Sequence, residues 1–206
     1  GMTIGELALY FNNNCLTKPA RLRVVNMRNY TRATPYNTRM LSPLSPNIAT
    51  IDSCYGYSFL GLLGEISIVD VGVGTQYPFQ VIGLPRDLSQ VSIESWQQLR
   101  HQLKRYGLDS AIISYKNERK NEWYQGLKFK LHVMSRLSSL TIALDIIDFL
   151  KKHDICMQSG PAFDKVAGTE MMRHMMQGLC TRDSFAHKAN SDVAAFFKKA
   201  KRMLLY

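Results

Sequence analysis

The stretch SIESWQQLRHQLKRYGLDSAIIS (92–114) decides the fold class, because a helix pattern in it is followed directly by a strand pattern. Its apolar side chains recur at the three- and four-residue spacing of one helix face: Ile93, Trp96, Leu99, Leu103 and Tyr106. Ser92 is a favourable N-cap, and Gly107 is a favourable C-terminal stop. The apolar run SAIIS (110–114) is typical of a strand. We therefore expect a helix that leads into a strand.

Further strands and helices are expected on both sides of this stretch. LKFKLHV (127–133) alternates apolar and polar side chains, which predicts a half-buried strand: Leu127, Phe129, Leu131 and Val133 against Lys128, Lys130 and His132. PFQVIGLP (78–85) predicts a strand closed by proline, and SSLTIALDIIDFLKK (138–152) predicts a helix capped by Ser138 or Ser139. Two more helices are expected at roughly 169–178 and 191–203.

The N-terminal third of the chain begins with a helix signal. In GMTIGELALYFNNN (1–14), Thr3 and Glu6 have capping-box spacing. LRVVNM (22–27) predicts a strand, and residues 28–50, rich in arginine and proline, predict a long loop. Residues 51–63 suit a buried helix or strand, and Thr50 and Asp52 favour the helix. Residues 64–76 are expected to be extended and to run into a glycine-bearing loop.

These patterns together predict an α/β (or α+β) fold, in which helices pack on a mixed β-sheet in a single compact domain. The chain has 206 residues, of which 46% are hydrophobic, so it can bury a sizeable core without metal or disulfide support. It contains no 18-residue apolar run that would span a bilayer and no export signal. We expect a folded protein without a membrane span.

The net charge of +10 allows two interpretations, a nucleic-acid-binding surface or an ordinary basic surface. It is compatible with nucleic-acid binding, but the 26 lysines and arginines are scattered along the chain, which favours an ordinary basic surface, and we expect no nucleic-acid partner. The four cysteines, Cys15, Cys54, Cys156 and Cys180, include no C-x-x-C pair, so neither a zinc site nor a redox motif is indicated, and their pairing stays open.

The glycine pair in VGVGT (71–75) suggests a phosphate-binding loop. Paired glycines let backbone amides approach an anion, but a dinucleotide fingerprint also needs a third glycine and a following helix, and here Tyr77 and Pro78 open a strand. A glycine turn between two strands is therefore favoured. The five histidines are isolated, and no G-x-S-x-G turn is present. We expect no cofactor and no metal.

The order of several short stretches resembles one bacterial family, the NamZ-type peptidoglycan exo-β-N-acetylmuramidases, over nearly all 206 residues. The stretches that carry the resemblance are GMTIGELALYFN (1–12), LRVVNMRNYTR (22–32), SPLSPNIAT (42–50), PFQVIGLP (78–85), GLKFKLHVMSR (126–136), FDKVAGTEMMR (163–173) and LLY (204–206). Ala49 stands where the family usually has proline. No single stretch is specific, and their order is the signal.

The resemblance implies an exported enzyme that removes N-acetylmuramic acid from the ends of peptidoglycan fragments, in the periplasm or outside the cell. It also implies two domains: an N-terminal Rossmann-like domain that carries the catalytic carboxylate, and a C-terminal α/β domain that closes the cleft. On this basis residues 1–206 are expected to be the C-terminal auxiliary domain. The catalytic domain is then absent from this chain, and no catalytic residue is assigned here.

The glycine turn departs from the family pattern. Where the family shows S-E-G-R-G-T, this chain has Asp70-Val71-Gly72-Val73-Gly74-Thr75, so valines replace the glutamate and the arginine. An arginine fork suits a carboxylate such as the lactyl group of muramic acid, whereas valine donates no hydrogen bond. The resemblance therefore leaves open whether the parent protein recognises this substrate.

Two functions follow from the resemblance. The first is the cleft-forming auxiliary domain of a peptidoglycan exo-β-N-acetylmuramidase, inactive alone, whose partners are the cognate N-terminal catalytic domain and peptidoglycan fragments or muramyl sugars. The second is a non-catalytic peptidoglycan- or protein-binding module of a diverged branch. The residues expected at the substrate or the cleft are Tyr30, Arg32, Ser45, Asn47, Asp70, Gly72, Gly74 and Thr75.

Overall fold

The computed structural model describes residues 1–34, 45–48, 50–88, 90–131, 138–159 and 162–206. Contacts within the chain divide it into two compact units, which we describe separately. The terminal unit consists of residues 1–39 and 183–206, and the central unit consists of residues 40–182. The glycine turn and all the strands of the described chain belong to the central unit.

The central unit is built around a three-stranded sheet of order β1-β3-β2. The strands are β1 (Val81–Pro85), β2 (Asp109–Asn117) and β3 (Glu122–Lys130). Both neighbouring pairs are antiparallel, so the sheet of the described chain is antiparallel and not the mixed sheet that was expected. The combination of helices with this sheet confirms the predicted α/β (or α+β) class.

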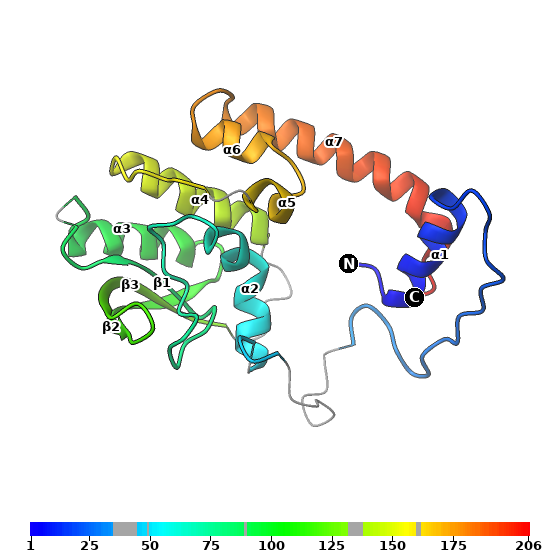
Figure 1. The fold of residues 1–206 in the computed structure, drawn as a ribbon, viewed down its shortest axis with the longest axis horizontal. Coiled ribbons are helices and arrows are strands. Elements are labelled where there is room, and N and C mark those ends of the chain that lie inside the picture. The colour runs from blue at the N-terminus through cyan, green and yellow to red at the C-terminus, as the bar shows by residue number, and fades with distance from the viewer. Residues whose placement is uncertain (35–44, 49, 89, 132–137, 160–161) are drawn as a thin grey trace. The chain divides into compact units, whose positions relative to one another are not determined.

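Five helices accompany the sheet: α2 (Ile51–Leu63), α3 (Ile93–Lys104), α4 (Ser139–Lys152), α5 (Phe163–Ala167) and α6 (Met171–Met176). Helix α3 packs on β2 and β3, and α4 packs on α2 and α3 (Figure 1). The predicted caps Thr50, Ser92 and Ser138 each accept a hydrogen bond from the first turn of their helix. The choice of a helix for residues 51–63 is thereby confirmed.

The core lies between the sheet and these helices. The predicted alternation in β3 is confirmed, because Leu127 and Phe129 are buried while Lys130 is exposed. The ring of Phe59 on α2 meets Phe129 edge to face, with 5.3 Å between the ring centroids. His132 and Val133, which the predicted strand also included, lie outside the described residues.

The terminal unit contains α1 (Ile4–Asn14), most of α7 (Arg182–Ala200) and a 3-10 turn (Lys201–Met203). The capping box is formed: the Thr3 hydroxyl accepts from the Glu6 amide, and the Glu6 carboxylate accepts from the Thr3 amide. The predicted helix at 191–203 corresponds to the second half of α7 and the 3-10 turn that follows it, and the first half of α7 was not predicted.

Two further sequence-based expectations were wrong. Residues 22–27 form no strand, because no other segment of the described chain pairs with them. Residues 64–76 form turns and two isolated bridges, Ile66 with Ser159 and Asp70 with Gly83. The helix expected at roughly 169–178 is confirmed as the shorter α6, while α5, which ends before Gly168 with its positive φ of 70°, was not predicted.

Part of the predicted loop at 28–50 lies outside the described residues, namely 35–44 and 49. The described cysteines are all free thiols. Among the helices in the described part of the chain, none is long and apolar enough to cross a membrane.

Candidate functional site

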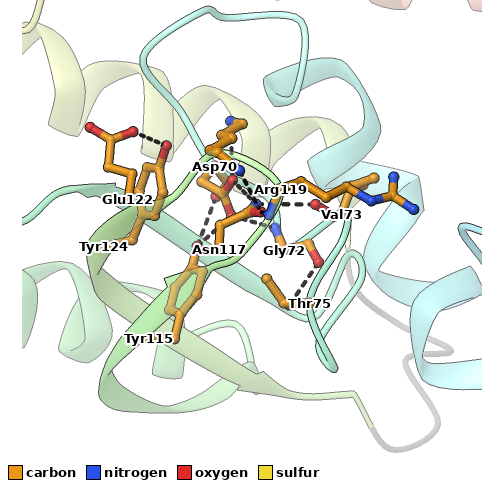
Figure 2. Close-up of polar contacts among 10 residues, drawn as sticks. Asp70, Gly72, Val73, Thr75, Tyr115, Asn117, Arg119, Glu122 and Tyr124 are labelled. Atoms are coloured by element: carbon orange, nitrogen blue, oxygen red, sulfur yellow. Dashed lines mark hydrogen bonds and ion pairs between the residues drawn. The ribbon is translucent and has the colours of Figure 1, made fainter.

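The glycine turn, residues 70–79, is a tightly closed loop that leads into β1 (Figure 2). Gly72 and Gly74 adopt positive φ angles of 79° and 92°, which side chains rarely tolerate. A Cβ on Gly72 would also lie 2.2 Å from the Tyr77 carbonyl oxygen. Glycine is therefore required at both positions for the loop to close.

Thr75 holds the turn from inside. Its hydroxyl donates to the Gly72 carbonyl at 2.8 Å and accepts from the Tyr77 amide at 3.0 Å. Its own amide donates to the same Gly72 carbonyl at 3.0 Å. The polar groups of Thr75 thus fix the shape of the turn.

Asp70 anchors the turn to the rest of the central unit. It is 1% exposed, and its carboxylate accepts hydrogen bonds from several groups. The donors are the Gly72 amide, the Tyr115 hydroxyl and the Asn117 amide, each at 2.8 Å, and the Lys120 ammonium at 3.1 Å. Because four donors surround this buried carboxylate, Asp70 acts as a structural anchor and has no free oxygen for a ligand.

Asn117 joins the turn to the hairpin between β2 and β3. Its side-chain amide donates both to Asp70 and to the Val73 carbonyl, the latter at 3.1 Å. Its side-chain oxygen accepts from the amides of Arg119 and Lys120 at 3.1 and 3.4 Å. One buried side chain therefore fixes the glycine turn and the tip of the hairpin against each other (Figure 2).

Tyr115 reaches Asp70 by crossing the sheet at Gly83. A Cβ on Gly83 would lie 2.7 Å from the Tyr115 hydroxyl, so the absence of a side chain there lets the phenol pass. Burial, and then the charge of Asp70, raise the pKa of Tyr115 well above its ordinary value of 10. The phenol is therefore a neutral hydrogen-bond donor at physiological pH.

A hollow of about 500 Å³ opens on one side of the turn, and we call it the Trp123 hollow. It is lined by Gly74, Thr75, Gln76, Tyr77, Ile113, Ser114, Tyr115, Lys116, Glu118 and Trp123. The indole of Trp123 is 50% exposed, and the Tyr77 ring is covered by the Lys128 ammonium 4.0 Å from its centroid. The hollow thus combines an exposed aromatic face with amide, hydroxyl and charged groups, and its size suits a small ligand.

A second hollow of about 360 Å³ lies at the same turn, and we call it the Arg119 hollow. Its apolar wall is formed by Gly61, Gly64, Val69, Val71, Val73 and Phe79. Charged groups complete it: Arg119 and Lys120 from the hairpin, with Glu65 and Asp70. The two valines that depart from the family pattern therefore lie at this hollow, where Val71 is buried and Val73 half-buried.

The structure brings four of the predicted site residues together, Asp70, Gly72, Gly74 and Thr75. Tyr30 and Arg32 lie in the terminal unit and are engaged there. The Arg32 guanidinium donates to the Glu6 carboxylate at 2.6 Å and to the Tyr206 carbonyl at 3.0 Å, and the Tyr30 ring packs on Tyr206. These two residues contribute to the structure of the terminal unit.

Glu6 is the centre of that arrangement. It is fully buried, and it accepts from Arg32 and from the Leu205 and Thr3 amides, both at 2.7 Å. Burial alone would raise the pKa of Glu6, but these hydrogen bonds outweigh it and lower the pKa to about 2. The carboxylate thus ties α1 to the C-terminal residues of the chain.

Ser45 and Asn47 are exposed in a turn that the Ile48 amide closes onto the Ser45 carbonyl at 2.9 Å. No described hydrogen bond joins their side chains to the glycine turn. No group of three His, Cys, Asp or Glu side chains in the described residues is arranged to hold a metal ion.

Sequence reasoning missed the half of the site that the hairpin supplies, namely Tyr115, Asn117, Arg119, Lys120 and Trp123. The segment between the two predicted strands has the composition of a charged turn. Tyr115 is 45 residues from Asp70 in the sequence, so no local pattern indicates that the two are in contact. Only the pairing of β2 with β3 places these residues beside the glycine turn.

Comparisons with known proteins agree with this architecture. Residues 55–206 match the sequence model described as exo-beta-N-acetylmuramidase NamZ, C-terminal, and residues 1–52 match that of the N-terminal part. The boundary between the two family models thus falls between residues 52 and 55, whereas sequence reasoning assigned all of 1–206 to one domain.

Two relatives extend over the whole chain. It is 27% identical to the peptidoglycan beta-N-acetylmuramidase NamZ of Bacillus subtilis, over all of this chain and 50% of that protein. It also resembles a crystal structure of a DUF1343 family protein from Bacteroides fragilis, with a TM-score of 0.77 and 26% identity, over all of this chain and 56% of that one. The chain therefore spans about half the length of these relatives. Because one family model covers most of its residues, the chain belongs to the NamZ exo-beta-N-acetylmuramidase family.

Proposed function

We propose that this chain forms the substrate-holding, cleft-forming part of a peptidoglycan exo-β-N-acetylmuramidase, with the Trp123 hollow as its sugar site. Membership of the NamZ family supports the substrate class. The observation that carries the proposal is the Trp123 hollow, in which an exposed indole stands beside a glycine turn that Asp70 and Asn117 hold rigid.

The chemistry of the hollow suits a sugar. The exposed indole of Trp123 offers an apolar face to the C–H groups of a pyranose ring, and its neighbours offer hydrogen bonds to hydroxyl and acetamido groups. Gln76 is exposed at the hollow, and the Ser114 hydroxyl is already oriented by a hydrogen bond to Gln125. A preformed site of this kind needs little reorganisation on binding.

Hydrolysis itself is proposed to be carried out by groups outside this chain. Glycoside hydrolysis ordinarily needs two carboxyl groups that flank the scissile bond. Asp70 is buried and saturated by donors, and Glu118, at the Trp123 hollow, is paired with Lys116 at 2.9 Å. We therefore propose that the catalytic carboxylates belong to the part of the family's N-terminal region that lies outside these 206 residues, and that this chain alone is inactive.

The terminal unit offers a surface for that partner. Its residues 1–39 lie within the match to the N-terminal family model. Several of its apolar side chains are exposed: Ile4, Leu7, Phe11, Leu16, Leu22, Val25, Met27, Val193, Phe196 and Phe197. We propose that these side chains contribute to the surface that the N-terminal region covers. The residues of LRVVNM (22–27) are suited to extend a sheet that the N-terminal region supplies.

Sugar binding is tested by the fluorescence of Trp123. Trp96 is buried, so a ligand in the hollow is expected to change the emission of Trp123 alone. We expect N-acetylmuramic acid and N-acetylglucosamine to shift the emission, and W123A to lose at least about 1 kcal/mol of binding by calorimetry. His101→Ala, an exposed change on α3, is the matched control. Unchanged affinity in W123A would remove the sugar site from this hollow.

The competing function is a non-catalytic peptidoglycan- or protein-binding module, favoured by Val71 and Val73 at the turn. A fusion of the N-terminal half of the Bacillus subtilis relative to residue 1 of this chain distinguishes the two functions. Release of N-acetylmuramic acid from a chromogenic muramide, lost in W123A, supports the enzyme. Sugar binding without release by a folded fusion supports the binding module.

The place of action follows from the substrate. Peptidoglycan lies outside the cytoplasmic membrane, so we propose a periplasmic or extracellular location. Immunoblotting of cell fractions tests this location, and we expect the native gene product in the periplasm or the medium.

A further inference from the structure

We infer that Arg119 recognises a carboxylate on the ligand of the glycine turn, and this inference rests on the sugar-binding function proposed above. Arg119 lies at the tip of the β2–β3 hairpin, outside both of its strands, and its side chain is exposed. Four features point to this role: a fixed backbone, a glycine that receives the side chain, an unpaired charge and an apolar hollow.

The backbone of Arg119 is fixed by a buried residue. Its amide donates to the side-chain oxygen of Asn117 at 3.1 Å, and Asn117 is in turn bonded to Asp70. The point from which the long side chain departs is therefore held, so less conformational entropy is lost when the guanidinium binds a ligand.

The stem of Arg119 lies directly on Gly74. A Cβ on Gly74 would lie 2.5 Å from Cδ of Arg119 and 2.9 Å from its Cγ. Any other residue at position 74 would displace this stem. Gly74 also lines the Trp123 hollow, so the stem of Arg119 lies against a residue of the proposed sugar site.

The charge of Arg119 is available, whereas that of its neighbour is not. The Lys120 ammonium is paired with buried Asp70 at 3.1 Å and lies over the Tyr124 ring. Arg119 forms no ion pair with any residue that the structure describes, and Figure 2 shows its guanidinium directed away from the Asp70 cluster. A planar guanidinium can bind a carboxylate through two parallel hydrogen bonds.

The hollow beside this guanidinium selects the kind of carboxylate. Its wall is apolar, with Val71, Val73 and Phe79, so it suits a carboxylate that is carried on a small alkyl group. The lactyl ether that distinguishes N-acetylmuramic acid from N-acetylglucosamine is such a group. Glu65 lies at the same hollow, and its negative charge weakens the binding of an anion there.

The test compares these two sugars by calorimetry at low salt, with the whole chain and its variants. We expect the unmodified chain to bind N-acetylmuramic acid about 10-fold more tightly than N-acetylglucosamine, the effect of one charge-assisted pair. In R119A this preference is expected to disappear while N-acetylglucosamine affinity is kept, and R119K is expected to restore part of it. Glu65→Gln is expected to strengthen the preference. Arg105→Ala, an exposed arginine at the end of α3, is the matched control.

The possible results separate this inference from the function on which it rests. If both sugars bind and R119A keeps the preference, Arg119 is not the carboxylate site, but the sugar site stands. If R119A loses both sugars equally while the NMR amide signals of Gly72 and Gly74 show a folded turn, Arg119 does not discriminate the carboxylate. If neither sugar binds the unmodified chain, the proposed sugar site fails, and the inference fails with it.

Discussion

Glu6 in the terminal unit and Asp70 in the central unit are both buried carboxylates, and the two are used differently. Both accept hydrogen bonds from a cation and from backbone amide groups. The backbone donors to Glu6 are the amides of Thr3 and Leu205, near the two ends of the chain, and the third donor is Arg32, so they close the unit. The donors to Asp70 come from the glycine turn and the hairpin, so they shape two hollows.

The comparison also concerns the arginines. Arg32 donates to Glu6 and to the Gly1 and Tyr206 carbonyls, so its guanidinium is occupied by the terminal unit itself. At Asp70 the paired cation is Lys120, and Arg119 beside it stays available. Glu6 is therefore paired with an arginine, whereas Asp70 is paired with a lysine and leaves the neighbouring arginine without an ion pair in the described chain.

The largest expected effect comes from removing either carboxylate. D70A and E6A each leave a cation and several donors without their acceptor, and we expect each to lower the free energy of unfolding of its own unit by about 3 to 5 kcal/mol. Hydrogen exchange resolved by residue measures this: D70A should expose β1 and the turn, and E6A should expose α1. Only D70A should abolish sugar binding. Wild-type sugar affinity in D70A would contradict the role given to the turn.

Acid should act on the Glu6 centre. The pKa of Glu6 is lowered to about 2 from its ordinary 4.5, so the unfolded state binds the proton more tightly. The stabilisation is therefore fully present above pH 4.5 and lost as the pH falls towards 2, an effect on the order of 2 to 3 kcal/mol. Hydrogen exchange of α1 between pH 5 and 2 measures it. E6Q should remove this pH dependence, and its persistence would assign it to another group.

The tyrosines of the sheet provide a smaller test. Y115F removes a hydroxyl that donates to buried Asp70, and we expect a loss of about 1 to 2 kcal/mol in the free energy of unfolding. Y124F is the matched control, because its hydroxyl donates to Glu122, which is only partly buried. Urea denaturation followed by circular dichroism measures both. Equal losses in the two variants would mean that the hydrogen bond to Asp70 stabilises the fold no more than the hydrogen bond to Glu122 does.

The smallest expected effect concerns Gly74. Gly74→Ala and Gly107→Ala both introduce a Cβ at a positive φ, 92° and 84°, but only Gly74 has the Arg119 stem within contact distance. We expect Gly74→Ala to destabilise by about 1 kcal/mol more than Gly107→Ala. In the double variant with R119A this extra cost should vanish. If it remains, the stem of Arg119 does not lie on Gly74 in solution.

The glycine turn shows how far sequence reasoning reached into the site. Gly72, Gly74 and Thr75 were found because turn chemistry is local: two glycines and a hydroxyl within a few residues have few other uses. Asp70 was found with them, but its buried anchoring role was not, since its partners Tyr115 and Asn117 are separated from it by more than 40 residues. Arg119 and Trp123 carried no signal at all.

The strand expected at LRVVNM (22–27) shows the opposite failure. Its β-branched and apolar residues favour a strand, but a strand exists only where a second strand pairs with its backbone, and the described chain supplies none there. Val25 is consequently 83% exposed. The sequence therefore identifies a segment with the properties of a strand, but the described structure contains no second strand that pairs with it.

By itself the sequence determined what depends on neighbours a few residues away: the caps of α1 to α4, the apolar stripe of α3, the alternation in β3 and the glycine turn. The order of its motifs also determined the family. Only the tertiary structure decided that the hairpin from β2 to β3 meets the turn, that Asp70 is filled by four donors, and that Arg119 is left free. The reason is physical: caps and turns are satisfied by local hydrogen bonds, whereas a buried carboxylate takes whichever donors the packed sheet brings to it.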